Sequence, residues 1–369
     1  MRLLFIGALP EPMTGQALAG RVLLEGLPGD IHADVIDLSK RQFRQGFDSF
    51  GRTLEVGRIL WRVWRRRRHA DVIYLTVSES IAGNLKDLVI YLLCTRQLRR
   101  MAIHLHGGAG MKRLMASGGP LRRLNATFVS RLGGVIILGP SHAEIYRGVV
   151  PEAKLHVVPN FAEDILFTTV ERLDTKFRNP APFRMLFLSN LLPGKGHLEL
   201  LEAFAGLSPA LQSRVELDFA GGFESDAQKD AFLSRIAVFP QIRYHGTVSG
   251  APKVELFANA HLFCLPTYYP YEGQPISILE AYASGCAVVT TDHSGIPDVF
   301  ADGVNGYQVE RQSVSALRAA IERAVADPDA LRRMALTNFQ TAVTAFRADI
   351  YRHAVVRVLR AVAGSGGQR

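Results

Sequence analysis

Short apolar runs alternate with longer helical patterns along the whole chain. This alternation limits the classes of fold that the chain can adopt. The runs form two series of five: Leu3–Ile6, Ala33–Ile36, Val72–Leu75, Ile103–Leu105 and Val135–Leu138, then Arg184–Leu188, Val215–Ala220, Ile242–Tyr244, Leu262–Leu265 and Ala287–Thr290. Helical patterns such as Gln16–Glu25 and Ile276–Ala283 separate them. Uniformly apolar strands alternating with helices predict parallel sheets covered on both faces. The chain is therefore expected to be an α/β protein with two doubly wound domains.

A polar stretch marks the boundary between the two series. Residues 163–182 lack a strand pattern and end in Asn-Pro-Ala-Pro. We therefore expect a first domain at 1–165, a linker at 166–182, a second domain at 183–345, and a C-terminal helix at 346–369 that crosses back to the first domain. A length of 369 residues agrees with two domains of about 100–200 residues each.

Composition excludes several classes of protein. No run reaches the roughly 18 apolar residues of a membrane span, and the first run meets Pro10 after Leu9, so it is interpreted as a buried strand and not as a signal peptide. Three dispersed cysteines exclude a disulfide framework or zinc finger and favour a reducing cytosol. GxGxxG, Walker and GxSxG motifs are absent, and Asp327-Pro328-Asp329 is interpreted as a helix cap.

The densest chemical stretch contains two glutamates, Glu272 and Glu280, with Pro275 between them where a helical pattern starts. A helix N-terminus that follows a buried strand offers free N–H groups and a positive dipole end, which suit a diphosphate. Glu280, two turns into the helix, could accept hydrogen bonds from the vicinal hydroxyls of a ribose. Taken alone, glutamates at this spacing are more often solvated helix charges.

Three further strand exits lie at the same expected sheet edge. Lys195 belongs to the loop Asn190–Gly196, which joins a strand to a helix, and His245–Val248 and His293–Pro297 follow other strands. Ligands of open α/β sheets bind at the carboxyl ends of the strands. The four exits together predict a site for a nucleoside diphosphate.

This set of motifs closely resembles the family-4 retaining glycosyltransferases of GT-B fold (glycosyl transferases group 1), of the bacterial cell-surface polysaccharide type. The resemblance covers nearly the whole chain. It is carried by E-x7-E at Glu272–Glu280, the Lys195-Gly196 loop, Asn160 after a strand, and the runs Gly295–Asp298 and Asp302–Gly306. It implies two Rossmann-like domains with the active site in the cleft between them, a UDP-, GDP- or ADP-sugar as donor substrate, and neither metal nor other cofactor.

The resemblance also implies roles for individual residues. His106 and Glu272 would be catalytic, beside the transferring sugar, Lys195 would neutralise the diphosphate, and Glu280 would hold the ribose. The other implied donor contacts are Gly15, Asn190, Gly196, Gly246, Val248, Gly273, Gln274, Pro275 and Ile276. Two positions depart from the family: Asn190 stands where an Arg is usual, and Gln274-Pro275 replaces Phe-Gly.

The formal charge of +9 belongs to the first half, because residues 1–165 hold 23 Lys and Arg against 14 Asp and Glu. Residues 51–68 read as a basic amphipathic helix with two tryptophans, which is typical of a helix lying on an anionic membrane. The expected membrane or acceptor contacts are Trp61, Trp64, Arg65, Arg66, Arg67, Arg68, Lys112 and Arg113. A merely solvated helix face remains open, and no nucleic-acid-binding motif accompanies the charge.

The sequence thus predicts a retaining, metal-independent hexosyltransferase. It would move a sugar from a nucleoside-diphosphate donor to a lipid-linked or polysaccharide acceptor in bacterial surface polysaccharide biosynthesis, on the inner face of the plasma membrane, in the cytoplasm. Two alternatives stay open: a nucleotide-sugar epimerase of GT-B-like fold, and a non-catalytic basic protein that binds lipid or nucleic acid. The last would have no affinity for nucleoside diphosphates. The donor sugar, the acceptor and the oligomeric state are not predicted.

Overall fold

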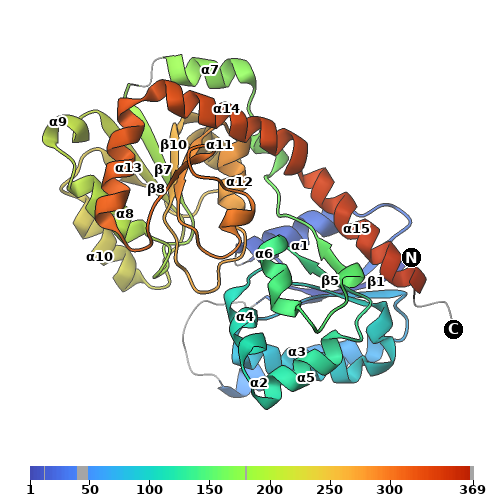
Figure 1. Cartoon of the computed structure of the whole chain (residues 1–369). Coiled ribbons are helices and arrows are strands. Elements are labelled where there is room, and N and C mark those ends of the chain that lie inside the picture. Colours follow the sequence, from blue (N-terminus) through green and yellow to red (C-terminus); the bar gives the residue numbers. More distant parts are fainter. Residues whose placement is uncertain (12, 40–48, 179–180, 366–369) are drawn as a thin grey trace. The chain divides into compact units, whose positions relative to one another are not determined.

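The structure is a computed structural model that describes residues 1–11, 13–39, 49–178 and 181–365. The chain divides into two compact units: residues 1–160 together with 349–369, and residues 161–348 (Figure 1). Each unit is built on its own parallel sheet of six strands. Each also has its own apolar core.

The first unit has the strand order β2-β1-β3-β4-β5-β6. Its strands are β1 (Arg2–Gly7), β2 (His32–Asp37), β3 (Val72–Thr76), β4 (Met101–His104), β5 (Gly134–Ile137) and β6 (Leu155–Val157). Its α-helices are α1 (Gly15–Glu25), α2 (Ser49–Arg66), α3 (Ile81–Leu93), α4 (Ala109–Ala116), α5 (Pro120–Val129), α6 (Pro140–Ala143) and α15 (Ala348–Ser365). The 3-10 helices are η1 (Thr95–Arg100), η2 (Glu144–Tyr146) and η3 (Glu152–Lys154). Helices α2, α3 and α5 cover one face of the sheet, and α1 and α15 cover the other (Figure 1).

The second unit has the strand order β12-β11-β10-β7-β8-β9. Its strands are β7 (Phe183–Leu188), β8 (Val215–Ala220), β9 (Ile242–Tyr244), β10 (Leu262–Leu265), β11 (Ala287–Thr290) and β12 (Gly306–Gln308). Its α-helices are α7 (Val170–Arg178), α8 (His197–Ala205), α9 (Pro209–Gln212), α10 (Asp226–Ile236), α11 (Gly250–Asn259), α12 (Ile276–Ala283), α13 (Val314–Ala326) and α14 (Pro328–Ala345). The 3-10 helices are η4 (Asp164–Leu166) and η5 (Ile296–Asp298).

The predicted strands are confirmed, and each sheet has one strand that the sequence did not predict. These are β6 and β12, each three residues long and each at the edge of its sheet. Neither segment contains a run of apolar residues long enough to predict a strand. Parallel pairing with the neighbouring strands, β5 and β11, holds these two segments in the extended conformation.

The expected linker at 166–182 is wrong as a linker, because most of it is folded into the second unit. Residues 170–178 form α7, whose Leu173 and Phe177 are buried in the core of that unit. Lys176 extends across to the carbonyl oxygens of Ala260 and Ser284, at 2.8 and 3.0 Å. The polar composition that suggested a linker is the outer face of an amphipathic helix.

The C-terminal helix α15 packs on the first unit. Tyr351, Val355 and Leu359 are buried, and the burial of each such side chain stabilises the fold by about 1.5–3 kcal/mol. Arg360 adds an ion pair with Asp30, with 2.9 Å between its nitrogen and the carboxylate oxygen. Residues 349–369 therefore belong to the first compact unit, although they follow the second unit in the chain.

Candidate active site

The loops that follow the strands of the second sheet are joined to one another at its carboxyl edge. Leu191 N–H donates to Gly222 O at 2.8 Å, and Gly221 N–H donates to Gly246 O at 2.7 Å, which ties the exits of β7, β8 and β9 together. Tyr268 N–H donates to Gly194 O at 2.7 Å, and this bond joins the exits of β10 and β7. The order of strands reverses between β7 and β10. Such a switch point is where open α/β sheets bind their ligands.

Lys195 and Glu272 meet at this switch point. The Lys195 ammonium lies 2.7 Å from Glu272 Oε2, and Thr267 Oγ1 donates to the same oxygen at 2.9 Å. Glu272 is buried, and the lysine nitrogen lies 4.8 Å from the centre of the Tyr269 ring. An ammonium has three N–H donors, so Lys195 can keep its carboxylate partner and still bind an anion.

Glu280 lies within α12 and is paired with Lys253, a lysine that sequence reasoning missed. Lys253 Nζ, on α11, lies 2.6 Å from Glu280 Oε1 and 2.7 Å from Glu163 Oε2. Glu280 and Lys253 are both buried. Burial raises the pKa of Glu280, and the charge of Lys253 opposes that rise. Burial lowers the pKa of Lys253, but the two carboxylates raise it by more, so the ammonium stays charged.

The N-terminus of α12 follows Glu272 closely in the chain. Pro275 is the N-cap residue, and no side chain caps this end of the helix. The preceding turn is held by the exit of β11, where Gly295 N–H donates to Gly273 O at 3.0 Å and Ser294 Oγ donates to Glu272 O at 2.6 Å. Gln274, Pro275 and Ile276 are buried with it. A positive dipole end fixed beside Lys195 and Glu272 suits a diphosphate.

Gly196 is required by the close approach of two loops. Its φ is +85°, and a Cβ at this position would lie 2.5 Å from Pro266 O. The residue is the N-cap of α8, where no side chain caps the helix. Any other residue would push the Lys195 loop away from the end of β10.

The amide at position 190 is half-buried beside the exit of β9. Asn190 Oδ1 and Thr247 Oγ1 both lie next to Gly222, within 3.3–3.6 Å of where a Cβ on that glycine would be. Gly246 has φ of +68°, and Val248 is half-buried before α11. These residues border the same sheet edge, farther along it than Lys195. Asn190 carries no charge, so positive potential at the switch point comes from Lys195 and from the N-terminus of α12.

His106 lies in the first unit, directly after β4. Its ring lies against that of His104, tilted by 30° with 3.9 Å between centroids, and Tyr74 OH is 2.7 Å from His104 Nδ1. Both ring nitrogens of His106 are buried without a hydrogen-bond partner among the described residues. Burial lowers the pKa of His106 to about 3. The imidazole is therefore neutral at physiological pH, and its nitrogens are left for a ligand or water to satisfy.

Glu79, which sequence reasoning also missed, supports the loop that carries His106. Its Oε2 accepts a hydrogen bond from Gly110 N–H, in the first turn of α4, at 3.4 Å, and Gly108, the N-cap of that helix, offers no side chain. The carboxyl also packs on Gly107, where a Cβ would come within 2.5 Å of it. Burial raises the pKa of Glu79 to about 7, although the α4 N–H groups oppose the rise.

Gly15 is exposed at the start of α1, where Thr14 Oγ1 accepts from Ala17 N–H at 3.2 Å. Gln16 Nε2 donates to Thr76 Oγ1 at 2.6 Å, which fixes this helix end beside the exit of β3. His106 and Gly15 thus lie at the carboxyl edge of the first sheet. The donor-side residues lie at the carboxyl edge of the second sheet.

The basic positions of α2 divide into two groups. Trp61 and Trp64 are exposed, and the guanidinium groups of Arg65 and Arg67 each lie 5.4 Å from the centre of one of their rings. Arg66 instead pairs with Asp34 of β2 and therefore anchors the helix to the sheet. Arg68, Lys112 and Arg113 are exposed, whereas Arg66 and Arg67 are half-buried. Among the described helices, none is long and apolar enough to cross a membrane.

The described residues contain no group of three or more His, Cys, Asp or Glu side chains placed to hold a metal ion. Asp327, the first residue of Asp327-Pro328-Asp329, caps α14 by accepting a hydrogen bond from Ala330 N–H at 2.9 Å. This confirms the interpretation of that motif as a helix cap.

The comparison with protein families agrees with this geometry. A family model described as Glycosyl transferases group 1 matches residues 171–340, which is most of the second unit. Residues 171–340 are a glycosyl transferases group 1 domain. The switch-point residues Lys195 and Glu272, and also Glu280 and Lys253, all belong to this group 1 domain.

Two curated mannosyltransferases each align with 57% of this chain. The chain is 28% identical over 220 residues to the MMP alpha-(1->4)-mannosyltransferase of Mycolicibacterium hassiacum, covering 57% of this chain and 51% of that protein. It is 29% identical over 215 residues to the phosphatidyl-myo-inositol mannosyltransferase of Mycobacterium tuberculosis, covering 57% and 55%. The aligned part spans about half the length of these relatives.

Solved structures extend the likeness of fold beyond the group 1 domain. The structure of Anabaena HepE in complex with UDP has a TM-score of 0.74 at 16% identity, over 98% of this chain and 100% of that one. Its complex with UDP-glucose has a TM-score of 0.72 at 17% identity, over 98% and 99%. The predicted fold class, GT-B with two Rossmann-like α/β domains, is confirmed.

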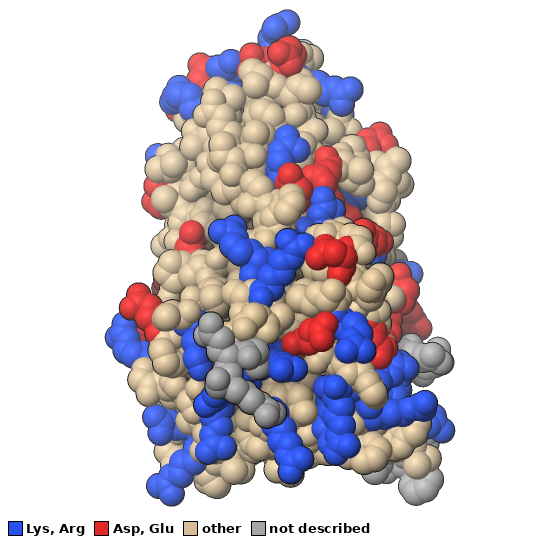
Figure 2. All heavy atoms as spheres, turned by 90° about the vertical axis from the view of Figure 1, so that its right-hand side faces the viewer, with Lys and Arg blue, Asp and Glu red and all other residues tan. Residues whose placement is uncertain are grey.

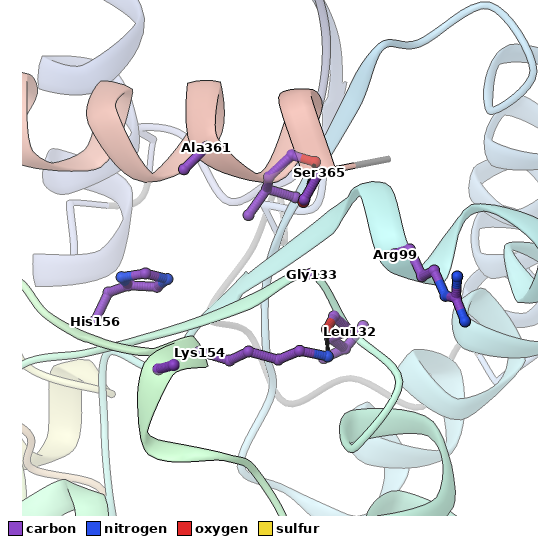
Figure 3. A pocket seen from close by; sticks show the side chains of 9 residues that line it. Arg99, Leu132, Gly133, Lys154, His156, Ala361 and Ser365 are labelled. Atoms are coloured by element: carbon purple, nitrogen blue, oxygen red, sulfur yellow. Dashed lines mark hydrogen bonds between the residues drawn. The ribbon is translucent and has the colours of Figure 1, made fainter. Parts of the chain in front are cut away.

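A cavity in the first unit lies away from these residues. It measures about 450 Å³ and is bordered by Arg99, Lys154 and His156 together with the last turns of α15. Figure 3 shows Lys154 extending to Leu132, and its Nζ donates to the carbonyl oxygen there at 2.8 Å. The cavity is at the amino ends of β5 and β6, whereas His106 follows the carboxyl end of β4. It is therefore not part of the candidate active site.

Proposed function

We propose that this chain is a glycosyltransferase that moves a hexose from a nucleoside-diphosphate sugar to a lipid-linked or glycan acceptor. The observation that carries the proposal is the pairing of Lys195 with Glu272 at the β7/β10 switch point, below the N-terminus of α12. The relatives' names favour mannose as the sugar. The HepE complexes support a nucleotide or nucleotide sugar as the ligand of this fold.

The proposed reaction breaks the bond between the anomeric carbon and the donor diphosphate. Negative charge then grows on the leaving diphosphate, and preorganised donors at that position lower the barrier. Lys195 and the free N–H groups at the start of α12 supply such donors. Glu280, which pairs with the Lys253 ammonium, would accept hydrogen bonds from the ribose, and Glu272 would face the transferring sugar.

His106 would act as a neutral hydrogen-bonding group in this reaction. With a pKa of about 3, its imidazole does not carry a proton to donate as a charged acid at neutral pH. It can donate one hydrogen bond and accept another, which suits hydroxyls of the sugar or the acceptor. Retention of configuration and independence from metal are part of the proposal, as the family resemblance implies.

We also propose that the protein works at the cytoplasmic face of the plasma membrane, in surface polysaccharide biosynthesis. The exposed Trp61 and Trp64, with the exposed cations Arg65, Arg68, Lys112 and Arg113, support attraction to anionic lipid. A lipid-linked acceptor would be reached from this surface.

Titration with UDP, GDP and ADP tests the proposal, and we expect tight binding of one of them. Lys195→Met should weaken that binding roughly 30- to 100-fold, because charge-assisted hydrogen bonds to phosphate are lost. Glu280→Gln should weaken it while leaving the circular dichroism spectrum unchanged, and exposed Lys229→Met on α10 is the matched control. Binding of none of the three nucleotides by the unaltered chain would refute the proposal.

A screen of nucleotide sugars then identifies the donor. Release of the nucleoside diphosphate with transfer or hydrolysis of the sugar is the expected result. Formation of an epimeric nucleotide sugar or of an epimeric free sugar without transfer would instead support the epimerase alternative. Product analysis by NMR distinguishes these outcomes and gives the anomeric configuration.

A further inference from the structure

Helix α3 presents an apolar outer face to solvent. Ile81, Leu85, Val89 and Leu92 are 68%, 49%, 39% and 63% exposed. Their spacing of three or four residues places them on one side of the helix. Lys86 does not interrupt this side, because its ammonium pairs with the buried Asp87 at 2.7 Å and its side chain is only 15% exposed. A helix face of this kind normally packs against something.

The helices on either side of α3 extend this surface. α3 contacts both α2 and α5 in the layer that covers one face of the first sheet (Figure 1). We define the apolar face as the exposed apolar side chains of these three helices: Leu54, Trp61, Trp64, Ile81, Leu85, Val89, Leu92 and Leu124. Contiguous exposed apolar surface is uncommon on monomeric proteins and marks sites of interaction.

Basic side chains accompany the apolar face. The exposed ones on α2, η1 and α5 and just after α2 are Arg58, Arg65, Arg68, Arg96, Arg99, Arg100, Arg122 and Arg123. Among the described side chains of α2, α3, α5 and η1, Glu55 is the only exposed carboxylate. Figure 2 shows Lys and Arg gathering over the lower part of the view, which belongs to the first unit.

An anionic bilayer is the occupant that fits both properties. Hydrocarbon accepts the apolar side chains, and anionic headgroups accept the arginines around them. A second copy of this chain fits less well, because a two-fold interface places the same patch on both subunits and would bring these arginines together. Exposed apolar side chains together with exposed arginines therefore favour a membrane, and not a second copy of the chain, as the partner of this surface.

We infer that the α3 part of the apolar face inserts into the interface of an anionic membrane and sets the depth of the first unit there. This inference deepens the proposed membrane association, on which it rests, by naming the inserted element. The helix begins two residues after Glu79, which supports the His106 loop. Insertion of α3 would therefore hold the acceptor side of the candidate active site close to the lipid headgroups.

Vesicle flotation at two salt concentrations separates the two kinds of attraction. The probe is a vesicle of phosphatidylglycerol and phosphatidylcholine, and at about 1 M salt the Debye length falls to about 3 Å, so attraction to arginines is screened. We expect a fraction of the protein to remain bound there. Leu85→Gln, Val89→Gln and Leu92→Gln combined should lower partitioning at high salt at least about tenfold, because apolar area no longer leaves water.

The matched control changes three exposed apolar residues of the second unit: Ile165→Gln, Val238→Gln and Val304→Gln. These should leave flotation unchanged. Equal losses in both triple variants would overturn the inference. Light scattering adds a second criterion: a dimer that the α3 variant abolishes would assign the apolar face to self-association and would also overturn it.

Depth is measured with a single tryptophan on α3. The chain has two tryptophans, so Trp61→Phe and Trp64→Phe clear the background, and Leu92→Trp places the reporter. Lipids brominated on the acyl chain should quench this reporter, and a reporter at Val238→Trp should stay unquenched. A Leu92→Trp reporter that stays unquenched on vesicle-bound protein would refute insertion.

Nucleotide titration of the same variants keeps the inference separate from the proposed function. The α3 variants should bind the nucleoside diphosphate as well as the unaltered chain does, since no α3 residue belongs to the donor side. Absence of nucleotide binding in every variant would refute the proposed function, whereas the flotation and quenching results would still decide the role of α3.

Discussion

Lys253 lies between two carboxylates, and its charge opposes the rise in the pKa of Glu280 that burial causes. The sequence offered no sign of this role, because Lys253 lies in α11, 27 residues from Glu280 and 90 from Glu163. Removing one partner of a buried ion pair is costly because the other charge is left uncompensated. The lysine is therefore a positioning residue for the ribose side of the proposed donor site.

Replacing Lys253 by Met should make nucleotide affinity depend on pH. Burial and the charge of Glu163 both raise the pKa of Glu280, and the Lys253 ammonium opposes this rise. Without the ammonium, the carboxyl therefore takes up a proton at a higher pH, and a protonated carboxyl accepts hydrogen bonds poorly. Affinity should fall as the pH is lowered, and this fall should begin at a higher pH than in the unaltered chain. We would measure the dissociation constant across this range by calorimetry.

Lys253→Arg, which keeps the charge, should retain the pH profile of the unaltered chain and serves as the comparison. A Lys253→Met variant with an unchanged profile would show that the lysine has no influence on Glu280. Circular dichroism of each variant establishes that the fold is intact.

Glu79 predicts a pH dependence of stability. Burial raises its pKa from an ordinary 4.5 to about 7, so between these values the folded chain holds a proton that the unfolded chain releases. Stability is therefore lost as the pH rises through this window. Glu79→Gln keeps an acceptor for the α4 N–H groups and has no proton to lose.

The Glu79→Gln variant should gain stability relative to the unaltered chain between about pH 5 and pH 8, by at most about 3 kcal/mol. Denaturant unfolding at both pH values measures this difference. Glu152→Gln, at an exposed position, should show no such trend. A difference between variant and parent that is the same at both pH values would contradict the prediction.

Among the elements, α8 and α12 matter through their N-termini. Both start without a side-chain cap, and both follow strands at the switch point of the second sheet. Unsatisfied N–H groups and positive dipole ends at one sheet edge favour an anion there. The N-termini of α8 and α12 thus provide positive potential at a sheet edge where Asn190 carries no charge.

Gly196→Ala should destabilise the second unit by roughly 2–4 kcal/mol, because a left-handed φ and a backbone contact are both strained by a Cβ. It should also weaken nucleotide binding, since the Lys195 loop moves with it. Gly206→Ala at the other end of α8 is the matched control: its φ is negative, and a Cβ would meet its nearest neighbour at an ordinary 3.4 Å. Equal effects of the two substitutions would contradict this account.

On the scale of the whole molecule, the two units have separate cores and differ in charge. The surplus of positive charge lies in residues 1–165, while the group 1 domain lies in the second unit. Ligand binding to the native state raises stability by about 2.7 kcal/mol at a hundred times the dissociation constant. A nucleotide should therefore stabilise the second unit selectively.

Thermal unfolding with and without the bound nucleotide tests this selectivity. Both tryptophans lie on α2, so their fluorescence reports the first unit, whereas far-ultraviolet circular dichroism reports both. We expect a shift in part of the dichroism transition and none in the fluorescence transition. Equal shifts in both signals would show that the two units unfold as one.

The fold was largely predictable because its signals are local. Each predicted strand is an apolar run that needs cover on both faces, and α12 begins and ends at the predicted residues, Ile276 and Ala283. Strands β6 and β12 escaped prediction because three residues carry too little pattern, and pairing with a neighbour decides their conformation. Helix α7 was mistaken for a linker because only Leu173 and Phe177 of its residues are buried.

The sequence by itself determined the two-sheet architecture and placed Lys195, Glu272 and Glu280 at one sheet edge, since residue pattern and strand order are enough for that. Only the tertiary structure decided which charges meet. Lys195 and Glu272 are 77 residues apart, and the partners of Lys253 and Glu79 come from other elements. Burial then sets their ionisation. Such contacts depend on how remote segments pack, and no local pattern of residues encodes that.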